Sequence, residues 1–251
     1  MIIDELMLMI KEKEYVLGLG NCVSEMHDIR DRSVDLILTD PPYNLGLFMK
    51  NRETNLGALR ENHFSASNWD LASPDEWEKL MKNFFEESAR VLKKKGAMIM
   101  FMSIIRVETI IKIAQQYGFY YKTTGIWHKL NPMPRNMNLH FINSTEAWIY
   151  FINQGKTGTF NNKGKAIHDF IETSIISSKE QKEGKHPTQK PEEILLHFIQ
   201  LLTNENDLVL DPFMGSGSTG VAALRAKRRF YGIELEEKYF NIAAKKLGRC
   251  R

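Results

Sequence analysis

The sequence has little of what would indicate a membrane-spanning, secreted or fibrous protein. Its 251 residues include two cysteines and eight prolines. Cys22 and Cys250 cannot build a disulfide framework and lack the spacing of a zinc site. The longest largely apolar run, residues 97–105, is too short to span a bilayer, and no basic stretch precedes Asp4 as it would in a secretory signal. We therefore expect a cytoplasmic protein that needs no metal.

Charge is nearly balanced over the whole chain but not along it. The formal net charge is +3, yet residues 122–168 carry six Lys or Arg side chains and one acidic residue, Glu146. A basic, acid-poor stretch is the expected electrostatic footprint of a surface that meets phosphates. A solvated, lysine-rich loop region is the alternative. Composition alone leaves both interpretations open.

Apolar runs alternate with helical patterns along most of the chain. The runs at 34–39, 97–102, 208–210 and 229–234 are typical of buried strands, and helical patterns occur near 74–95, 105–117, 192–203, 218–225 and 236–247. The first of these helices has a capping serine, Ser73, and we expect the lysines at 93–95 to meet its negative end and Gly96 to terminate it. The alternation predicts an α/β fold with a mostly parallel sheet covered by helices on both faces.

Two polar segments interrupt this alternation. Residues 44–72 are rich in Asn, Gly and Ser and are long for a structureless connection, which predicts a functional or mobile loop. Residues 153–190 are polar and lysine-rich, and we expect them to form an elaboration of the sheet. The chain is thus predicted to be one domain over residues 1–251.

A glycine-rich turn follows a predicted strand at residues 208–220. Its glycines, among them Gly215 and Gly217, let the backbone approach a ligand, and the following helix offers free N–H groups. Glu234 ends the next predicted strand, where a carboxylate can accept hydrogen bonds from ribose hydroxyls. A P-loop is excluded because Val221, not lysine, follows the last glycine. On this motif alone, a nicotinamide dinucleotide, a cationic ligand carrying an adenosine and a turn without ligand all stay open.

A second motif, Asp40-Pro41-Pro42-Tyr43, follows the predicted strand 34–39. Consecutive prolines fix the backbone and remove two N–H donors, so the carbonyls there are presented as acceptors. Asp40 and the Pro41 carbonyl could together accept both hydrogens of a planar amino group, and Tyr43 could stack on the ring that bears it. A Pro-Pro turn in which Asp40 caps local backbone is the alternative.

Together the two motifs resemble those of the beta group of amino-type DNA methyltransferases, in which the catalytic motif precedes the cofactor motif. The tetrapeptide at 40–43 looks like their catalytic motif, and the segment 213–217 looks like their cofactor motif. His186-Pro-Thr-Gln-Lys-Pro191 resembles the segment that contacts the methionine end of the cofactor, and 231–234 resembles the ribose-binding strand. Residues 127–134, with Glu146 after them, resemble a segment beside the target-base pocket. The resemblance covers nearly the whole chain. It implies that residues 44–72 form a mobile loop near the active site and that residues 153–190 form a target-recognition elaboration.

The resemblance implies a Rossmann-like methyltransferase fold with circularly permuted motif order. It also implies methyl transfer from S-adenosylmethionine to a base in double-stranded DNA. Because an aspartate heads the tetrapeptide, the acceptor it implies is N6 of a flipped-out adenine. The implied catalytic residues are Asp40, Pro41, Pro42 and Tyr43. The implied cofactor-binding residues are Asn21, Cys22, Asp40, His186, Thr188, Gln189, Lys190, Asp211, Pro212, Phe213, Gly215, Gly217, Ser218, Thr219 and Glu234. The implied DNA-binding residues are Lys129, Arg135, Asn136, Asn138, Lys156 and Lys163.

Several alternatives stay open at this point. Cytosine N4 is the second candidate acceptor, and many relatives carry an acidic residue where Asn21 stands. A noncatalytic cofactor-binding subunit would be expected to have lost Asp40 or Tyr43, and both are present. An RNA- or protein-directed methyltransferase could share the fold, whereas a nicotinamide-dependent oxidoreductase explains neither the Pro-Pro motif nor residues 186–191. A homodimer and a cognate restriction endonuclease are the partners to consider beside DNA.

Overall fold

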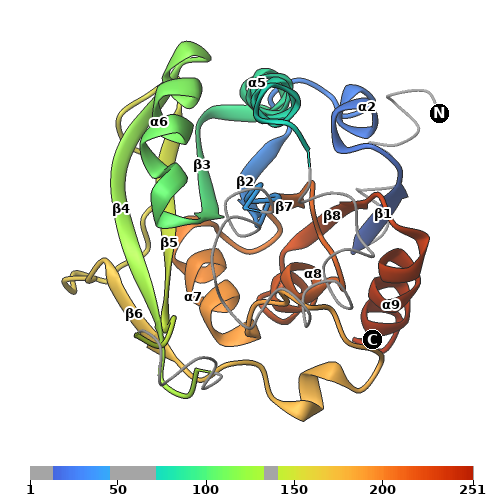
Figure 1. Ribbon diagram of the computed structural model, residues 1–251. Helices are drawn as coiled ribbons and strands as arrows, with labels where there is room; N and C mark the ends of the chain where they lie inside the picture. The colour runs from blue at the N-terminus through green and yellow to red at the C-terminus, as the bar shows by residue number, and fades with distance from the viewer. Residues whose placement is uncertain (1–13, 46–71, 133–140, 251) are drawn as a thin grey trace.

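The computed structural model describes residues 14–45, 72–132 and 141–250, without the side chain of Lys179. They form one eight-stranded sheet flanked by helices (Figure 1). The strands are β1 (Tyr15–Leu19), β2 (Val34–Thr39), β3 (Leu92–Met102), β4 (Phe119–Lys129), β5 (Thr145–Asn153), β6 (Phe170–Thr173), β7 (Leu208–Asp211) and β8 (Arg229–Glu234). The α-helices are α2 (Cys22–His27), α5 (Pro74–Val91), α6 (Val107–Gln116), α7 (Glu192–Leu202), α8 (Ser218–Arg225) and α9 (Glu237–Gly248). Short 3-10 turns lie at η2 (Ile104–Arg106) and η3 (Ser178–Gln181).

The sheet has the order β1-β8-β7-β2-β3-β5-β4-β6 and consists of two different halves. The strands from β1 to β3 in this order all run parallel. Beyond them, β5 is antiparallel to both β3 and β4, and β6 pairs in parallel with β4. The mostly parallel sheet is therefore confirmed. We call the side where β2, β3, β4, β7 and β8 end the carboxyl edge, and the opposite side the amino edge.

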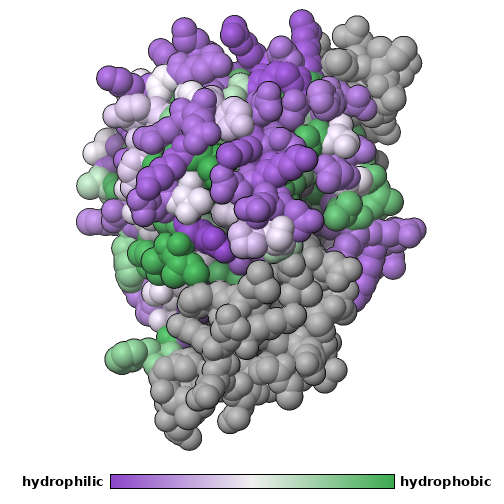
Figure 2. All heavy atoms as spheres, turned by 45° about the horizontal axis from the view of Figure 1, so that its top comes forward, coloured by the Kyte–Doolittle hydropathy of each residue, from purple (hydrophilic) through white to green (hydrophobic). Residues whose placement is uncertain are grey.

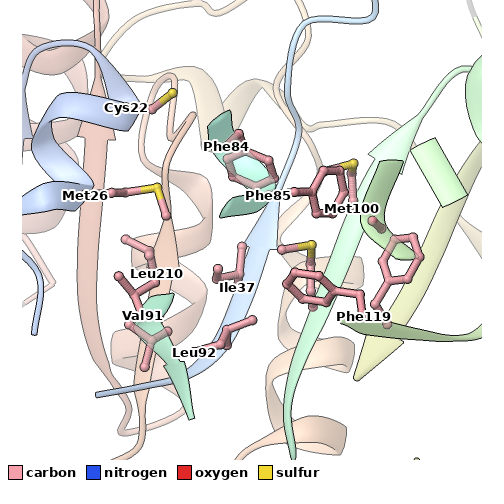
Figure 3. Packing of buried hydrophobic residues seen from close by; sticks show 14 of the residues in the cluster. Cys22, Met26, Ile37, Phe84, Phe85, Val91, Leu92, Met100, Phe119 and Leu210 are labelled. Atoms are coloured by element: carbon pink, nitrogen blue, oxygen red, sulfur yellow. The ribbon is translucent and has the colours of Figure 1, made fainter. Parts of the chain in front are cut away.

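Each face of the sheet has its own apolar core, because alternate residues of a strand point to opposite faces. On one face, α2, α5 and α6 pack against residues such as Ile37 and Leu210. Figure 3 shows Phe84 and Phe85 of α5 among these side chains. On the other face, α7, α8 and α9 pack against neighbouring positions such as Leu38. Helices thus cover both faces, as the alternation predicts.

The end of the first long helix differs from the sequence-based expectation. Ser73 and Glu76 form the predicted capping box, but α5 ends at Val91 and not at residue 95. Leu92 is fully buried as a strand partner of Val34, so β3 begins there. The lysines at 93–95 are therefore strand residues and do not meet the negative end of a helix, and Gly96 lies inside β3.

The two polar segments have different outcomes. Most of the predicted loop at 44–72 lies outside the described residues. The segment 153–190 contributes β6 and η3, and β6 extends the sheet beside β4. Figure 2 turns the top of Figure 1 forward and shows a mainly hydrophilic face with a few separate hydrophobic areas. In the described parts of the chain, no helix is both long and apolar enough to cross a membrane.

Candidate active site

The two sequence motifs meet at the carboxyl edge because their strands are neighbours. β2 and β7 pair in parallel, with Leu36 opposite Val209 and Ile37 opposite Leu210 (Figure 1). Asp40 follows β2 directly, and the glycine turn follows β7. Ligands of open α/β sheets bind beyond the carboxyl ends of the strands. The structure therefore brings the tetrapeptide and the glycine turn to the edge where such a ligand would bind.

Asp40 belongs to a cluster of charged side chains from several elements. The hydroxyl of Tyr43 donates to Asp40 Oδ1 at 2.6 Å and lies 3.2 Å from Glu146 Oε2. The ammonium of Lys190 contacts Asp40 Oδ2 and lies 3.2 Å from Glu146 Oε2. Lys129 Nζ pairs with the other Glu146 oxygen at 2.5 Å. Two carboxylates and two ammonium groups thus balance each other around the Tyr43 hydroxyl.

The charges of the cluster fix its protonation. Burial would raise the pKa of Glu146, but the charges of Lys190 and Lys129 outweigh this and lower it to about 2. Burial would lower the pKa of Lys190, but the charges of Asp40 and Glu146 raise it. Burial, with the same two carboxylates, holds the pKa of Tyr43 well above its usual value. At neutral pH, Glu146 is therefore ionised, Lys190 is a cation, and Tyr43 is a hydrogen-bond donor.

The backbone of the tetrapeptide is held from the helical side. Trp77 Nε1 of α5 donates to the carbonyl of Pro42 at 2.7 Å. The guanidinium of Arg106 lies 4.9 Å from the centre of the Trp77 ring and donates to the carbonyl of Asn44 at 3.2 Å. Among the described residues, the carbonyl of Pro41 accepts no hydrogen bond. It therefore stays available as an acceptor beside Asp40.

The glycine turn is organised around a second buried carboxylate, Asp211. Its Oδ1 accepts hydrogen bonds from Thr39 Oγ1 at 2.8 Å and from the backbone N–H of Phe213 at 3.2 Å. Its Oδ2 accepts from Thr219 Oγ1 at 2.6 Å. Burial raises the pKa of Asp211 to about 7, although these hydrogen bonds act in the opposite direction. Asp211 and Thr219, predicted to bind cofactor, are thus occupied in holding the turn.

The turn itself brings polar groups to the start of α8. Gly215 and Gly217 have φ values of 52° and 79°, in the left-handed region that favours glycine. The N–H of Gly215 donates to Glu234 Oε2 at 2.9 Å, which joins the turn to the end of β8. The buried hydroxyl oxygen of Ser218, the first residue of α8, has no hydrogen-bond partner among the described residues. A free hydroxyl at a helix N-terminus fits a polar group of a bound ligand.

The segment 186–190 lies against the turn from the other side. The ring of His186 packs at 4.3 Å from the ring of Tyr239, and burial lowers the pKa of His186 to about 4. Gln189 Oε1 accepts from Ser216 Oγ at 2.9 Å and from Lys246 Nζ at 3.0 Å. The structure therefore places Gln189 beside the glycine turn. Among the other residues predicted here, Thr188 lies beside His186, Pro212 is buried in the turn, and Phe213 packs on Phe84.

The predicted cofactor-binding residues Asn21 and Cys22 lie where β1 and β8 end side by side. The N–H of Gly20 donates to the carbonyl of Glu234 at 2.9 Å, so the two strand ends are joined. Asn21 caps α2 and accepts from the N–H of Val23 at 3.0 Å. Cys22 is buried, and burial raises the pKa of its thiol to about 12, so the thiol stays protonated. Both residues are thus near Glu234, with the Asn21 side chain already bound to its own helix.

The predicted DNA-binding residues are not all at this edge. Lys129 is in the charged cluster through Glu146. Lys156, in contrast, follows β5 at the amino edge, where its carbonyl accepts from Lys122 Nζ at 3.1 Å. Lys163 lies in a turn attached to the end of α7 at that same edge. The structure therefore separates these two lysines from Asp40. Arg135, Asn136 and Asn138 lie outside the described residues.

Some residues of the site were not predicted. Trp77 has the helical spacing of a core residue of α5, and this spacing does not show that its N–H reaches Pro42. Arg106 and Lys246 carry no sequence signal. As a site residue, Glu146 is indicated only through the family resemblance, although an acidic residue just before the apolar run 147–152 is a usable signal. The resemblance also assigns Lys190 to the cofactor, whereas its ammonium contacts Asp40.

Comparisons with known proteins agree on one family. Residues 34–245 match the model of a family described as DNA methylase. Type II methyltransferase M2.LlaDCHI of Lactococcus lactis subsp. cremoris is 33% identical over 234 residues, covering 89% of this chain and 86% of that protein. Type II methyltransferase M2.DpnII of Streptococcus pneumoniae is 33% identical over 229 residues, covering 87% and 84%.

Solved structures have the same architecture. The M1.HpyAVI complex with S-adenosylmethionine superposes with a TM-score of 0.72 at 28% identity, covering 93% of this chain and 98% of that chain. The cytosine-N4-specific PvuII DNA methyltransferase gives a TM-score of 0.73 at 17% identity, covering 95% and 91%. At that identity the second likeness concerns the fold alone.

Proposed function

Since the chain belongs to the DNA methylase family, S-adenosylmethionine is its methyl donor, and we propose that it methylates N6 of an adenine flipped out of duplex DNA. The observation that carries the proposal is the position, beside the glycine turn, of Asp40 and of the Pro41 carbonyl, which accepts no hydrogen bond from any described residue. We assign the turn, Ser218 and Glu234 to the cofactor, because they present a free hydroxyl, backbone approach and a carboxylate at one edge. Bound S-adenosylmethionine would supply an electrophilic methyl group.

The tetrapeptide supplies two hydrogen-bond acceptors that make the amino group of the base a better nucleophile. An exocyclic amino nitrogen is a poor nucleophile because its lone pair is delocalised into the ring. Hydrogen bonds from its two N–H groups to Asp40 and to the Pro41 carbonyl would favour a tetrahedral nitrogen and stabilise the positive charge that develops on it. Since both acceptors are fixed before the base arrives, their reorganisation costs little. We assign Tyr43 to the face of the base, next to the Asp40 carboxylate to which it is bound.

The choice of adenine rests on the residue at the head of the tetrapeptide. In the family that the sequence resembles, aspartate is usual for adenine and serine is commoner for cytosine, so Asp40 favours N6. The target base is inaccessible inside a duplex, which is why the reaction requires it to leave the stack. A homodimer, a cognate endonuclease and a cytoplasmic location stay predictions.

The test is to identify the modified nucleoside. The protein is incubated with unmethylated genomic DNA and labelled S-adenosylmethionine, the DNA is digested, and the labelled nucleoside is identified. We expect N6-methyladenine, and sequencing of the product then gives the site. N4-methylcytosine would contradict the base assignment but not the enzyme class. A parallel incubation with total RNA is the control: label in RNA and none in DNA, with cofactor binding intact, would contradict DNA as the substrate.

A further inference from the structure

The side chain of Lys190 occupies an unusual position for a cation. It is 6% exposed and contacts the oxygen Oδ2 of Asp40, the carboxylate that we assign to the amino group of the base. The rings of Phe101 and Tyr43 lie 5.1 Å and 5.7 Å from its ammonium. The neighbouring Gln189 points instead to the glycine turn, where it binds Ser216. Gln189 thus contacts the glycine turn, whereas Lys190 contacts the carboxylate that we assign to the target base.

The ammonium has one donor that is only loosely engaged. A lysine ammonium has three N–H groups. Two are directed at Asp40 and at Glu146, the latter at 3.2 Å. The third can reach only the Tyr43 hydroxyl among these groups. The distance from Lys190 Nζ to this hydroxyl oxygen is 3.5 Å, at the long end of the hydrogen-bond range. A ligand that brings a better acceptor to this point would take this third N–H without breaking the pair with Glu146.

Asp40 and Lys190 therefore present an acceptor and a donor side by side. The Watson–Crick edge of adenine has the complementary order, with the amino group as donor and the ring nitrogen N1 as acceptor next to it. Thymine pairs with adenine through this same combination of an acceptor oxygen and a neighbouring N–H. Enzymes that flip bases commonly read this edge. Guanine and thymine offer the reverse order, a carbonyl acceptor beside an N–H donor, and would place like groups opposite each other.

We propose that Lys190 is a specificity-determining residue that donates a hydrogen bond to N1 of the flipped adenine while Asp40 accepts from the amino group. This inference rests on the proposed function. It assigns the reading of amino-bearing bases to a pair of side chains, one from the end of β2 and one from the residues before α7. Glu146 holds the lysine in place from the other side, which makes Glu146 a positioning residue.

The test removes the ammonium of Lys190 and the ring nitrogen N1 of adenine, separately and together. Wild type and Lys190→Met are compared on duplexes with adenine or 1-deazaadenine at the methylated position, where C–H replaces N1. We expect wild type to lose about 10- to 100-fold in single-turnover rate without N1, the range for a hydrogen bond to a charged group. Lys190→Met should already be slow on adenine, and its ratio of adenine rate to 1-deazaadenine rate should be about 10- to 100-fold smaller than that of wild type. The weaker pairing of 1-deazaadenine changes this ratio by the same factor in both proteins and therefore cancels when the two ratios are compared.

Two controls separate this role from a structural one. Lys246→Met removes another buried lysine, which binds Gln189 and Ser216 at the glycine turn. We expect it to weaken S-adenosylmethionine binding, measured by calorimetry, and to keep the full response to N1. Lys190→Met should bind S-adenosylmethionine within twofold of wild type. If it folds poorly because Asp40 and Glu146 then repel each other, Lys190→Met combined with Glu146→Gln removes one of the two charges and carries the same test.

The outcomes are distinguishable. Equal wild-type rates on adenine and 1-deazaadenine, with 3-deazaadenine as a matched analogue, would overturn the role of Lys190 but not adenine methylation. The role of Lys190 would also be overturned if Lys190→Met lost as much rate as wild type when 1-deazaadenine replaces adenine. No methylation of the adenine duplex by wild type would instead contradict the proposed function. If the label is on cytosine, 3-deazacytosine takes the place of 1-deazaadenine, with the same expectation for Lys190.

Discussion

Asp40 and Asp211 end neighbouring strands of one sheet, yet the two regions around them are built from different partners. Asp211 is bound by two threonine hydroxyls and one backbone N–H, all neutral. Asp40 is bound by the ammonium of Lys190 and the hydroxyl of Tyr43, two side chains at the carboxyl edge. A carboxylate with fixed, neutral partners holds a turn in shape. A carboxylate bound by one cation and one hydroxyl, beside the glycine turn, is placed to accept hydrogen bonds from a substrate.

The largest expected effect is that of Asp40→Asn. The amide has one acceptor oxygen and would present an N–H to the amino group, so we expect methyl transfer to fall by at least about 100-fold. Binding of S-adenosylmethionine should stay within a few-fold of wild type. Single-turnover rates and calorimetry measure the two. The matched control is Asp35→Asn on the same strand, where Asp35 pairs with Lys93 at the amino edge. A normal rate for Asp40→Asn would contradict the role of Asp40.

Glu146→Gln tests whether the charged cluster depends on its balance. Lys190 and Lys129 would lose a partner in a mostly buried setting, where removal of one ion usually costs several kcal/mol. Because the carboxylate is 21% exposed, we expect a smaller loss of about 2 kcal/mol in the free energy of unfolding, measured in urea. Glu108→Gln, whose pair with Lys112 is exposed and screened by solvent, should leave it essentially unchanged. Equal effects would show that the cluster is energetically an ordinary surface network.

Gly217→Ala tests the rigid region around Asp211. A Cβ at this position would lie 2.9 Å from Cβ of Ala243, and its φ of 79° is already strained for alanine. We expect a loss of about 2–3 kcal/mol in unfolding free energy, together with weaker cofactor binding. Gly164→Ala has nearly the same φ, 74°, but nothing within 4 Å, and should lose only about 1 kcal/mol. Similar losses for both would mean that the packing of α9 against the turn is unimportant.

The most gradual effect is expected from the titration of Asp211, because it is spread over several pH units. Its pKa of about 7 in the folded protein exceeds the ordinary value of 3.8, so folding takes up a proton between these two pH values. This contribution to stability is complete below about pH 3.8 and is lost as pH rises through 7. Asp211→Asn does not titrate. Relative to the variant, wild type should therefore lose stability between pH 5 and 8, by at most about 1.4 kcal/mol per pH unit. A constant difference in urea unfolding over this range would contradict the raised pKa.

The parallel half of the fold could be predicted from the sequence, and the antiparallel half could not. Strands covered on both faces must be apolar along their whole length, so the runs 34–39 and 229–234 coincide with β2 and β8. β4 mixes buried and exposed positions, such as Tyr120 at 43% exposure, and has no such run. β6 is four residues long, and two of its residues are exposed. These strands are defined by their partners more than by their own composition.

The same reason limits prediction of the site. Asp40 and Gly215 stand in motifs of adjacent residues, which sequence alone can show. The contact of Lys190 with Glu146 joins residues before α7 and in β5, and it depends on the order of strands in the sheet. Lys156 belongs to the basic stretch, but β5 runs antiparallel and delivers it to the amino edge. A count of charges along the sequence does not show to which edge of the sheet a strand brings each charge.

The pairing of β1 with β8 has a consequence for how the protein is made. Tyr15 lies opposite Phe230, so the first described strand finds its neighbour only in one of the last. At roughly 5–20 residues per second, a ribosome needs on the order of ten seconds or more to reach β8 after β1 has emerged. Contacts this distant in sequence also slow folding itself. A nascent chain released before Arg229 would expose β1 and the free side of β7, and would be a substrate for chaperones and proteases before it could act on DNA.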